Sequence, residues 1–220
     1  MQTVLFDLDG TLIDHFTTIY RCVAYAQRLL DLPESSYELV RATVGGSVPI
    51  TLEKLIGKAR VEEALPLFRQ HFEEIMFEDL IELSGASWLL QQLNNRGHKL
   101  GVFTNKNAPH SRIILKHLAM DQWLDAIIGT GEGPHRKPDP EFSAYALETM
   151  QDHADNTIMI GDSPFDFAAA EAGGFRCYLV ATGSHSLADL RAHTNAAGYY
   201  EDLHELAAEV FNLTPCTIKS

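Results

Sequence analysis

Short apolar runs alternate with helical patterns over most of the chain. Buried strands are expected at 4–6, 100–103, 126–128, 157–160 and 177–180, and helices between or after them at 86–97, 113–118, 142–150, 165–172, 185–193 and 202–211. Continuous apolar runs are typical of strands that are covered on both faces, and strands that alternate with helices pair in parallel through right-handed crossovers. The pattern therefore predicts an α/β fold with a doubly wound parallel sheet.

One long stretch, 14–80, shows helical periodicity without a convincing strand. The helices expected there are 16–30, 35–44, 48–57 and 61–76. Pro33 ends the first of them, and Gly45-Gly46 separates the second from the third. We therefore expect a small all-helical cap domain at 14–80, inserted into a catalytic core that is made of 1–13 and 81–220.

Composition and charge narrow the choice of partners. The chain has 220 residues, of which 45% are hydrophobic, and its formal net charge of −13 repels nucleic acid and anionic membranes at long range. Met1 leads directly into the first predicted strand, and no apolar run approaches the roughly 20 residues of a membrane helix. We expect a cytoplasmic protein, monomeric or homodimeric, with neither nucleic acid nor membrane as a partner. Cys22, Cys177 and Cys216 lack metal-ligand spacing and are expected to be reduced.

Polar residues follow the predicted strands at the points where the strands end. They are Asp7, Asp9 and Gly10 after the first strand, Thr104, Asn105 and Lys106 after the second, Lys137 after the third, and Asp162 after the fourth. Ligands bind beyond the carboxyl ends of parallel strands, so we expect these residues to form one site. Asp7 and Asp9 would point to the same side of an extended chain, where two like charges need a cation or a proton between them.

Each of these residues also has a purely structural interpretation. Thr104 could cap the next helix, Lys137 could be a surface cation, and Asp162 could be an N-cap ahead of Pro164. Their joint occurrence at one edge of the predicted sheet favours a functional site instead.

The chemistry that suits these residues is phosphoryl transfer. Asp7 and Asp162 can supply carboxylate ligands to Mg²⁺, and Lys137 can place positive charge against a phosphate group. The Thr104 hydroxyl and backbone N–H groups near Gly10 can bind phosphate oxygens.

The aspartates can supply the nucleophile and the general acid and base of this reaction. One carboxylate can attack phosphorus to give an aspartyl-phosphate, while Asp9 can protonate the leaving oxygen and later deprotonate the attacking water. Asp166 lies one helical turn beyond Asp162 and could orient metal-bound water or Lys137. Asn105, beside Thr104, is a further candidate for substrate binding.

Four motifs resemble the signatures of the haloacid dehalogenase superfamily, in the same order. They are Asp7-Leu8-Asp9-Gly10-Thr11, Thr104 after an apolar strand, Lys137-Pro138-Asp139-Pro140, and Gly161-Asp162-Ser163-Pro164-Phe165-Asp166. The resemblance covers nearly the whole chain and implies a Rossmann-like core, a cap inserted after the first motif and a Mg²⁺-dependent hydrolase. It implies Asp7 as the nucleophile, Asp9 as the acid and base, and a metal site that Asp162 completes with the backbone carbonyl of Asp9.

The resemblance also bears on the substrate. Aspartate at position 9 favours phosphatase chemistry over dehalogenation, because leaving-group protonation needs an acid there. Thr104-Asn105-Lys106 is similar to the phosphoglycolate phosphatase branch, whereas Leu83-Ser84-Gly85-Ala86 departs from the Tyr/Phe-Pro-Gly often found before this helix and leaves the substrate open. We expect a small phosphorylated metabolite such as phosphoglycolate, with Arg41, Gly45-Gly46 and Lys54 as candidate contacts to the leaving group.

Other functions fit the same residues. A sugar-phosphate mutase of the β-phosphoglucomutase kind or a pyrophosphatase would share the whole core. A signalling receiver also combines a phospho-accepting aspartate with acidic metal ligands, a threonine and a lysine, although here the acceptor would lie on the first strand and a helical lid follows it. A non-catalytic binding protein that retains the fold is the remaining alternative.

Overall fold

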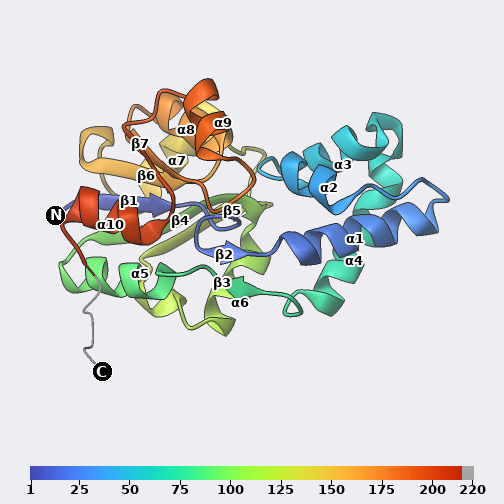
Figure 1. Cartoon of the computed structure of the whole chain (residues 1–220), viewed down its shortest axis with the longest axis horizontal. Coiled ribbons are helices and arrows are strands. Elements are labelled where there is room, and N and C mark those ends of the chain that lie inside the picture. Colours follow the sequence, from blue (N-terminus) through green and yellow to red (C-terminus); the bar gives the residue numbers. More distant parts are fainter. Residues whose placement is uncertain (215–220) are drawn as a thin grey trace.

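Strand β1 (Thr3–Phe6) lies at the centre of a parallel sheet in this computed structural model, which describes residues 1–214 (Figure 1). The other strands of this sheet are β4 (Lys99–Asn107), β5 (Ala126–Thr130), β6 (Thr157–Gly161), β7 (Arg176–Val180) and β8 (Gly198–Tyr200). Their order is β5-β4-β1-β6-β7-β8, and all neighbouring strands pair in parallel. The doubly wound sheet predicted from the sequence is confirmed.

Residues of β1 alternate between the two faces of the sheet. Val4 and Phe6 belong to the same hydrophobic cluster as α5 (Ala86–Asn95), α6 (Ala108–His117) and α10 (Leu203–Phe211). Leu5 belongs to the cluster of α7 (Pro140–Met150), α8 (Pro164–Gly173) and α9 (Leu187–His193). Figure 1 shows these two groups of helices on opposite sides of the sheet. The continuous apolar run therefore reflects burial on both faces.

The stretch predicted to be helical forms a lobe beside the sheet, at the right of Figure 1. It contains α1 (Phe16–Leu29), α2 (Tyr37–Thr43), α3 (Val48–Ile56) and α4 (Val61–Ile75). The two-residue strands β2 (Ile13–Asp14) and β3 (Ile81–Glu82) pair antiparallel where the chain enters and leaves this lobe. We call the lobe the cap; its status as a separate domain stays a prediction.

The structure differs from the sequence predictions in three strands and in the length of a fourth. β2, β3 and β8 were not predicted, because two or three residues are too few for an alternating pattern to be recognised. β4 continues beyond residue 103 through a bulge, in which residues 104–106 oppose Gly129 alone. A Cβ atom on Gly129 would lie 2.6 Å from the Lys106 carbonyl oxygen, so the bulge depends on this glycine.

Some features lie outside these elements. Short 3₁₀ turns occupy Lys58–Arg60, Asp121–Trp123 and Ala154–Asn156. Within residues 1–214, no helix combines the length and the apolar character needed to cross a membrane.

Cys22 and Cys177 are buried free thiols, as predicted. The frayed tail predicted from Pro215 onward, with Cys216, lies outside the described residues.

Leu5→Ala should lower the free energy of unfolding by about 2–5 kcal/mol, because Leu5 is fully buried under the helices of one face. Urea denaturation followed by circular dichroism measures this change. Leu29→Ala is the matched control: Leu29 is 54% exposed, and its replacement should change stability by no more than about 0.5 kcal/mol. Equal effects of the two replacements would contradict the central position of β1.

Candidate active site

The predicted polar residues converge at the carboxyl edge of the central strands. Asp7 follows β1 directly, and its N–H donates to the carbonyl of Ile160 on β6 at 2.9 Å. Asp162 follows β6, Thr104 lies in the bulge of β4, and Lys137 enters from the loop between β5 and α7. The sheet register therefore sets these groups side by side.

Lys137 lies at the centre of this group and is only 1% exposed. Its Nζ is 3.0 Å from Asp7 Oδ1 and 2.5 Å from Asp166 Oδ1, and it donates to the Phe103 carbonyl at 2.9 Å. Burial by itself lowers the pKa of Lys137, but the carboxylates of Asp166 and Asp7 outweigh it and raise that pKa above the usual value. The interpretation as a surface cation is wrong, since Lys137 is a buried ammonium group.

Both carboxylate oxygens of Asp166 accept hydrogen bonds. Oδ1 pairs with Lys137, while Oδ2 accepts from the N–H groups of Asp162 at 3.1 Å and Ser163 at 3.0 Å and from the Ser163 hydroxyl at 2.7 Å. A Cβ atom on Gly161 would lie 2.3 Å from Asp166 Cγ, so the close approach requires glycine there. The sequence suggested that Asp166 orients either metal-bound water or Lys137, and the structure shows contact with Lys137.

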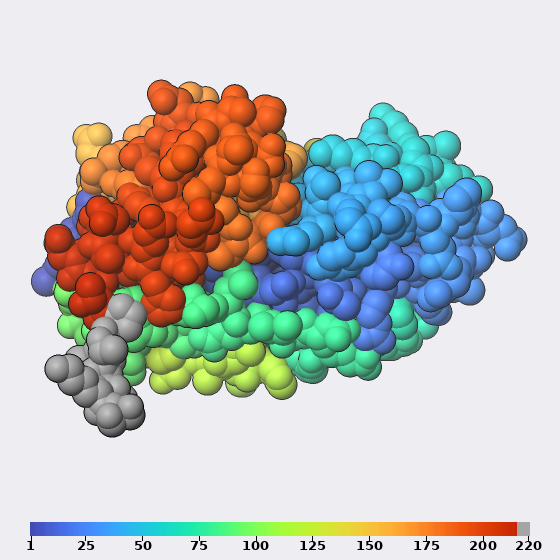
Figure 2. Space-filling model, viewed as in Figure 1, coloured from blue at the N-terminus to red at the C-terminus, as the bar shows by residue number. Residues whose placement is uncertain are grey.

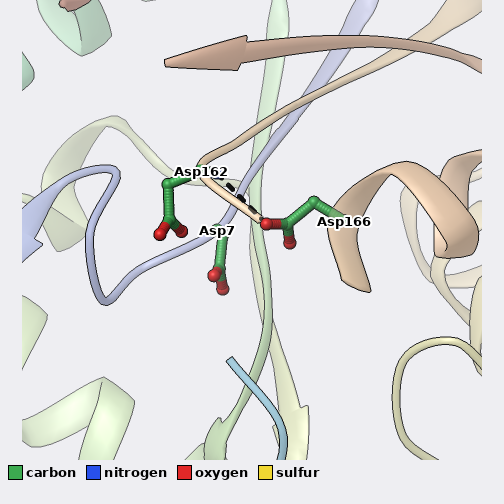
Figure 3. A group of neighbouring side chains, drawn as sticks. All are labelled: Asp7, Asp162 and Asp166. Carbon is green, nitrogen blue, oxygen red and sulfur yellow. Dashed lines mark hydrogen bonds between the residues drawn. The ribbon is translucent and has the colours of Figure 1, made fainter. Parts of the chain in front are cut away.

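Asp7, Asp162 and Asp166 point toward a common space (Figure 3), and one carboxylate oxygen of each lies within 4.8 Å of the others. Burial raises the pKa of Asp7 to about 6; Lys137 and Thr104 oppose this shift, and the charge of Asp166 adds to it. Burial, Asp166 and Asp7 likewise raise the pKa of Asp162 well above its usual value. Three buried carboxylates thus face one buried ammonium group.

This donor set fits a hard divalent cation. Carboxylate oxygens are the ligands that Mg²⁺ prefers, and a cation would offset the excess of buried negative charge. Both oxygens of Asp166 are engaged by hydrogen-bond donors, whereas Asp162 accepts hydrogen bonds from described residues only through Oδ2, from Ser184. Asp7 and Asp162 are therefore the better pair of ligands. Asp162 does not cap α8, since Ser163 is the N-cap residue.

Asp9 lies beside this group and is bound by a lysine to which the sequence analysis gave no role. Lys106 Nζ donates to both oxygens of Asp9, at 3.0 and 2.9 Å, and lies 4.9 Å from the centre of the Phe72 ring in the cap. Lys106 lies in the bulge of β4, where the alternation of a regular strand does not apply, so the sequence pattern gave no signal for this contact.

A buried histidine also lies close to Asp9. His15 Nδ1 is 3.8 Å from Asp9 Oδ1, and its Nε2 is 2.8 Å from the Met76 carbonyl oxygen. Burial and the charge of Lys106 lower the pKa of His15 to about 4, so the ring is neutral near pH 7. Its Nε2 then carries the proton and donates to Met76.

The remaining predicted residues also border the site. Thr104 is 2% exposed and does not cap α6, whose N-cap is Asn107. Gly10 has a positive φ of 87°, and a Cβ atom there would lie 2.6 Å from Asp162 Oδ2. Glycine is therefore needed at position 10 both for the turn and for the approach of Asp162.

Asn105 ties three segments together. Its side-chain oxygen accepts from the Lys137 N–H at 2.8 Å, and its Nδ2 donates to the carbonyls of Lys137 at 3.1 Å and of Gly45 in the cap at 3.0 Å. These bonds position the loop of Lys137. A direct contact between Asn105 and substrate stays a prediction.

A cavity lies between the cap and the core, and Asp9, Asn105 and Lys106 are among the residues that line it. Of the residues expected at the leaving group, Gly46 lines this cavity, whereas Gly45, Arg41 and Lys54 do not. Arg41 instead donates to the Gly183 carbonyl at 2.7 Å, and Lys54 lies over the Phe165 ring at 5.6 Å. Figure 2 shows the cap packed against the core at the junction of their surfaces.

The chain belongs to the family of haloacid dehalogenase-like hydrolases, because residues 4–180 match the model of that family. It is 30% identical to a phosphoglycolate phosphatase from Aquifex aeolicus, over 83% of this chain and 86% of that protein. It is 32% identical to a 5′-nucleotidase from Pseudomonas aeruginosa, over 86% of this chain and 87% of that protein.

Two further comparisons agree with this assignment. Pyrophosphatase PpaX from Bacillus mycoides is 30% identical over 88% of this chain and 89% of that protein. The crystal structure of a predicted phosphatase from Clostridium acetobutylicum superposes with a TM-score of 0.88, at 26% identity, over 96% of this chain and 99% of that one. The family resemblance drawn from the four motifs is thereby confirmed.

The contribution of Asp7 to the stability of the metal-free protein should fall as the pH rises from about 3.8 through about 6, whereas the contribution of His15, whose pKa folding lowers from 6.5 to about 4, should rise over much of the same range. The pKa of Asp7 is raised from 3.8 to about 6 by folding, so the unfolded chain favours the ionised carboxylate over this range. Added Mg²⁺ should offset this loss and raise the melting temperature more at about pH 7.5 than at about pH 5. Differential scanning fluorimetry with Mg²⁺ or with EDTA measures both shifts.

Asp162→Asn should raise the melting temperature of the metal-free protein and reduce the shift with Mg²⁺, because it removes one of the crowded buried charges. Asp121→Asn, an exposed aspartate in a 3₁₀ turn, is the control. A Mg²⁺ shift that is the same at both pH values, or that survives Asp162→Asn, would contradict a metal site at Asp7 and Asp162.

Proposed function

We propose that the protein is a Mg²⁺-dependent phosphatase that hydrolyses a small phosphate monoester through an aspartyl-phosphate on Asp7. The observation that carries this proposal is the buried group of Asp7, Lys137 and Asp162 at the carboxyl edge of the sheet. Relatives named phosphoglycolate phosphatase, pyrophosphatase and 5′-nucleotidase support a phosphorylated substrate.

The metal would be held by the carboxylates of Asp7 and Asp162 and by the backbone carbonyl of Asp9. When bound, Mg²⁺ supplies positive charge next to the phosphoryl group and makes the phosphorus more open to attack. Lys137 supplies further positive charge at the same phosphate, and Asp166 keeps its ammonium group in place through the contact at 2.5 Å.

Two chemical steps complete the reaction. An oxygen of Asp7 forms a bond to phosphorus while the bond from phosphorus to the ester oxygen breaks, and Asp9 gives that oxygen its proton. Asp9 then takes a proton from a water molecule, whose oxygen attacks the phosphorus and displaces Asp7. Thr104 and the N–H groups near Gly10 bind the other phosphate oxygens, and the products are an alcohol and inorganic phosphate.

Product analysis separates this proposal from its alternatives. Release of phosphate from pyrophosphate would favour the pyrophosphatase, which the relative in Bacillus mycoides makes the second candidate. Isomerisation of a sugar phosphate would identify a mutase. A long-lived phosphoprotein without turnover would favour a receiver, and failure to turn over any phosphorylated compound would favour a binding protein.

Asp7→Asn should lower kcat by at least roughly 10³-fold, because an amide cannot replace the carboxylate as the nucleophile. Phosphate release from p-nitrophenyl phosphate in the presence of Mg²⁺ measures the rate, and circular dichroism checks the fold. Asp121→Asn is the matched control and should retain full activity, because Asp121 is exposed in a 3₁₀ turn outside the site. Retention of more than about a tenth of the activity in Asp7→Asn would refute Asp7 as the nucleophile.

Asp9→Asn should slow the hydrolysis of alkyl phosphates by about 10²–10⁴-fold, because their leaving oxygen needs a proton. The first step with p-nitrophenyl phosphate needs none, since p-nitrophenolate is a good leaving group. We therefore expect Asp9→Asn to release a burst of p-nitrophenolate equal to the enzyme concentration, followed by slow turnover. Stopped-flow absorbance measures this burst; its absence, with equal losses on both substrates, would contradict the acid role of Asp9.

A further inference from the structure

The cavity beside Asp9 has walls from both the cap and the core. Phe68 and Phe72 on α4 contribute an apolar wall, and Val48 at the start of α3 adds to it. Asp9 and Lys106 lie at its inner side, where the leaving group of a substrate attached to Asp7 would begin. Under the proposed function, these walls would therefore surround the leaving group, since Asp7 and Lys137 do not line the cavity.

The charge of the cavity lining is opposite to that of the whole chain. The chain has 30 acidic and 17 basic residues, yet among the described residues Asp9 is the only carboxylate that lines the cavity. The positive charge of Lys106 offsets the negative charge of Asp9, because Lys106 Nζ donates to both carboxylate oxygens of Asp9. Of the remaining lining residues, Arg69 and Arg136 carry a permanent positive charge, and His110 and His135 are the other basic side chains.

These two arginines approach the cavity from opposite sides. Arg69 lies on α4 of the cap, and Arg136 lies in the core directly before Lys137. Both are exposed, so they lie at the opening of the cavity and not at its inner end. Within residues 1–214, neither guanidinium group has a carboxylate within 4.0 Å or a hydrogen-bond partner in the protein, whereas Arg112, for example, pairs with Glu132.

We propose that Arg69 and Arg136 bind a second anionic group on the leaving group, so that the enzyme prefers phosphate monoesters whose alcohol carries a carboxylate or another phosphate. This inference rests on the proposed phosphatase function and narrows its substrate. Guanidinium groups bind carboxylate and phosphate in the same forked geometry, so either anion satisfies the two arginines. Neutral leaving groups such as nucleosides or unsubstituted alcohols leave both unpaired.

Matched pairs of substrates test the preference in the wild-type enzyme with Mg²⁺. In the first pair, 2-phosphoglycolate is compared with 2-hydroxyethyl phosphate, in which a neutral hydroxymethyl group replaces the carboxylate. In the second, 1,3-propanediol bisphosphate is compared with 3-hydroxypropyl phosphate. We expect kcat/KM to favour the charged member of at least one pair by about 10–100-fold. The pair with the larger ratio identifies the preferred anion.

Single variants assign the preference to these residues. Arg69→Gln and Arg136→Gln should each reduce the ratio between charged and neutral substrates about tenfold, mainly through a higher KM for the charged member. Arg176→Gln is the matched control: Arg176 is exposed at the amino-terminal end of β7, away from the site, and its replacement should leave the ratio unchanged. Added salt should reduce the wild-type ratio, because both arginines are exposed.

The outcomes separate the inference from the function on which it rests. Equal kcat/KM values within both wild-type pairs, or ratios that Arg69→Gln and Arg136→Gln leave unchanged, would overturn the inference while the phosphatase function stands. A lack of phosphate release from all four substrates and from p-nitrophenyl phosphate would overturn the function and the inference together.

Discussion

The crowding of three carboxylates around one buried ammonium group governs the rest of this structure. Asp7, Asp162 and Asp166 lie within 4.8 Å of one another at a site from which water is largely excluded, and Lys137 is the only cation among them within the described residues. Like charges at such distances repel strongly where the effective dielectric constant is low. Burial is the main cause of the raised pKa of Asp7, and the charge of Asp166 adds to it. A bound cation would offset this excess of buried negative charge, which is why the donor set fits a metal ion.

Tertiary contacts around Lys137 make this arrangement specific. Asn105 holds the backbone of Lys137 from both sides, the Phe103 carbonyl accepts from its Nζ, and Asp166 fixes the ammonium group from α8. Asn105 lies in the bulge of β4, and its Nδ2 also reaches the Gly45 carbonyl in the cap. The residue that positions the cation therefore also joins the cap to the core. One side chain thus contacts both the cap and the segment that carries the positive charge.

The sequence predicted the acidic edge of the sheet well, because strand ends are visible in the apolar pattern and parallel strands bring their carboxyl ends together. It did not predict how Asp9 is held. The pairing with Lys106 depends on the bulge opposite Gly129, and no periodicity reveals such an irregularity. The sequence also did not predict which cap residues line the cavity, because this depends on how the cap docks on the core. Arg41 was expected at the leaving group but bonds to Gly183, whereas Arg69 lines the cavity, because the docking angle of the cap decides which helix faces inward.

Lys137 and the two arginines of the cavity differ in burial, and under the proposed function this difference would orient a substrate with two anionic groups. Lys137 is buried, so its charge acts in a low-dielectric environment and is little screened by salt. Arg69 and Arg136 are exposed, so water and salt weaken their attraction. A phosphoryl group is more highly charged than a carboxylate and gains most at the buried end, beside Asp7. In the proposed enzyme, the exposed arginines would then discriminate between leaving groups without competing for the group that reacts.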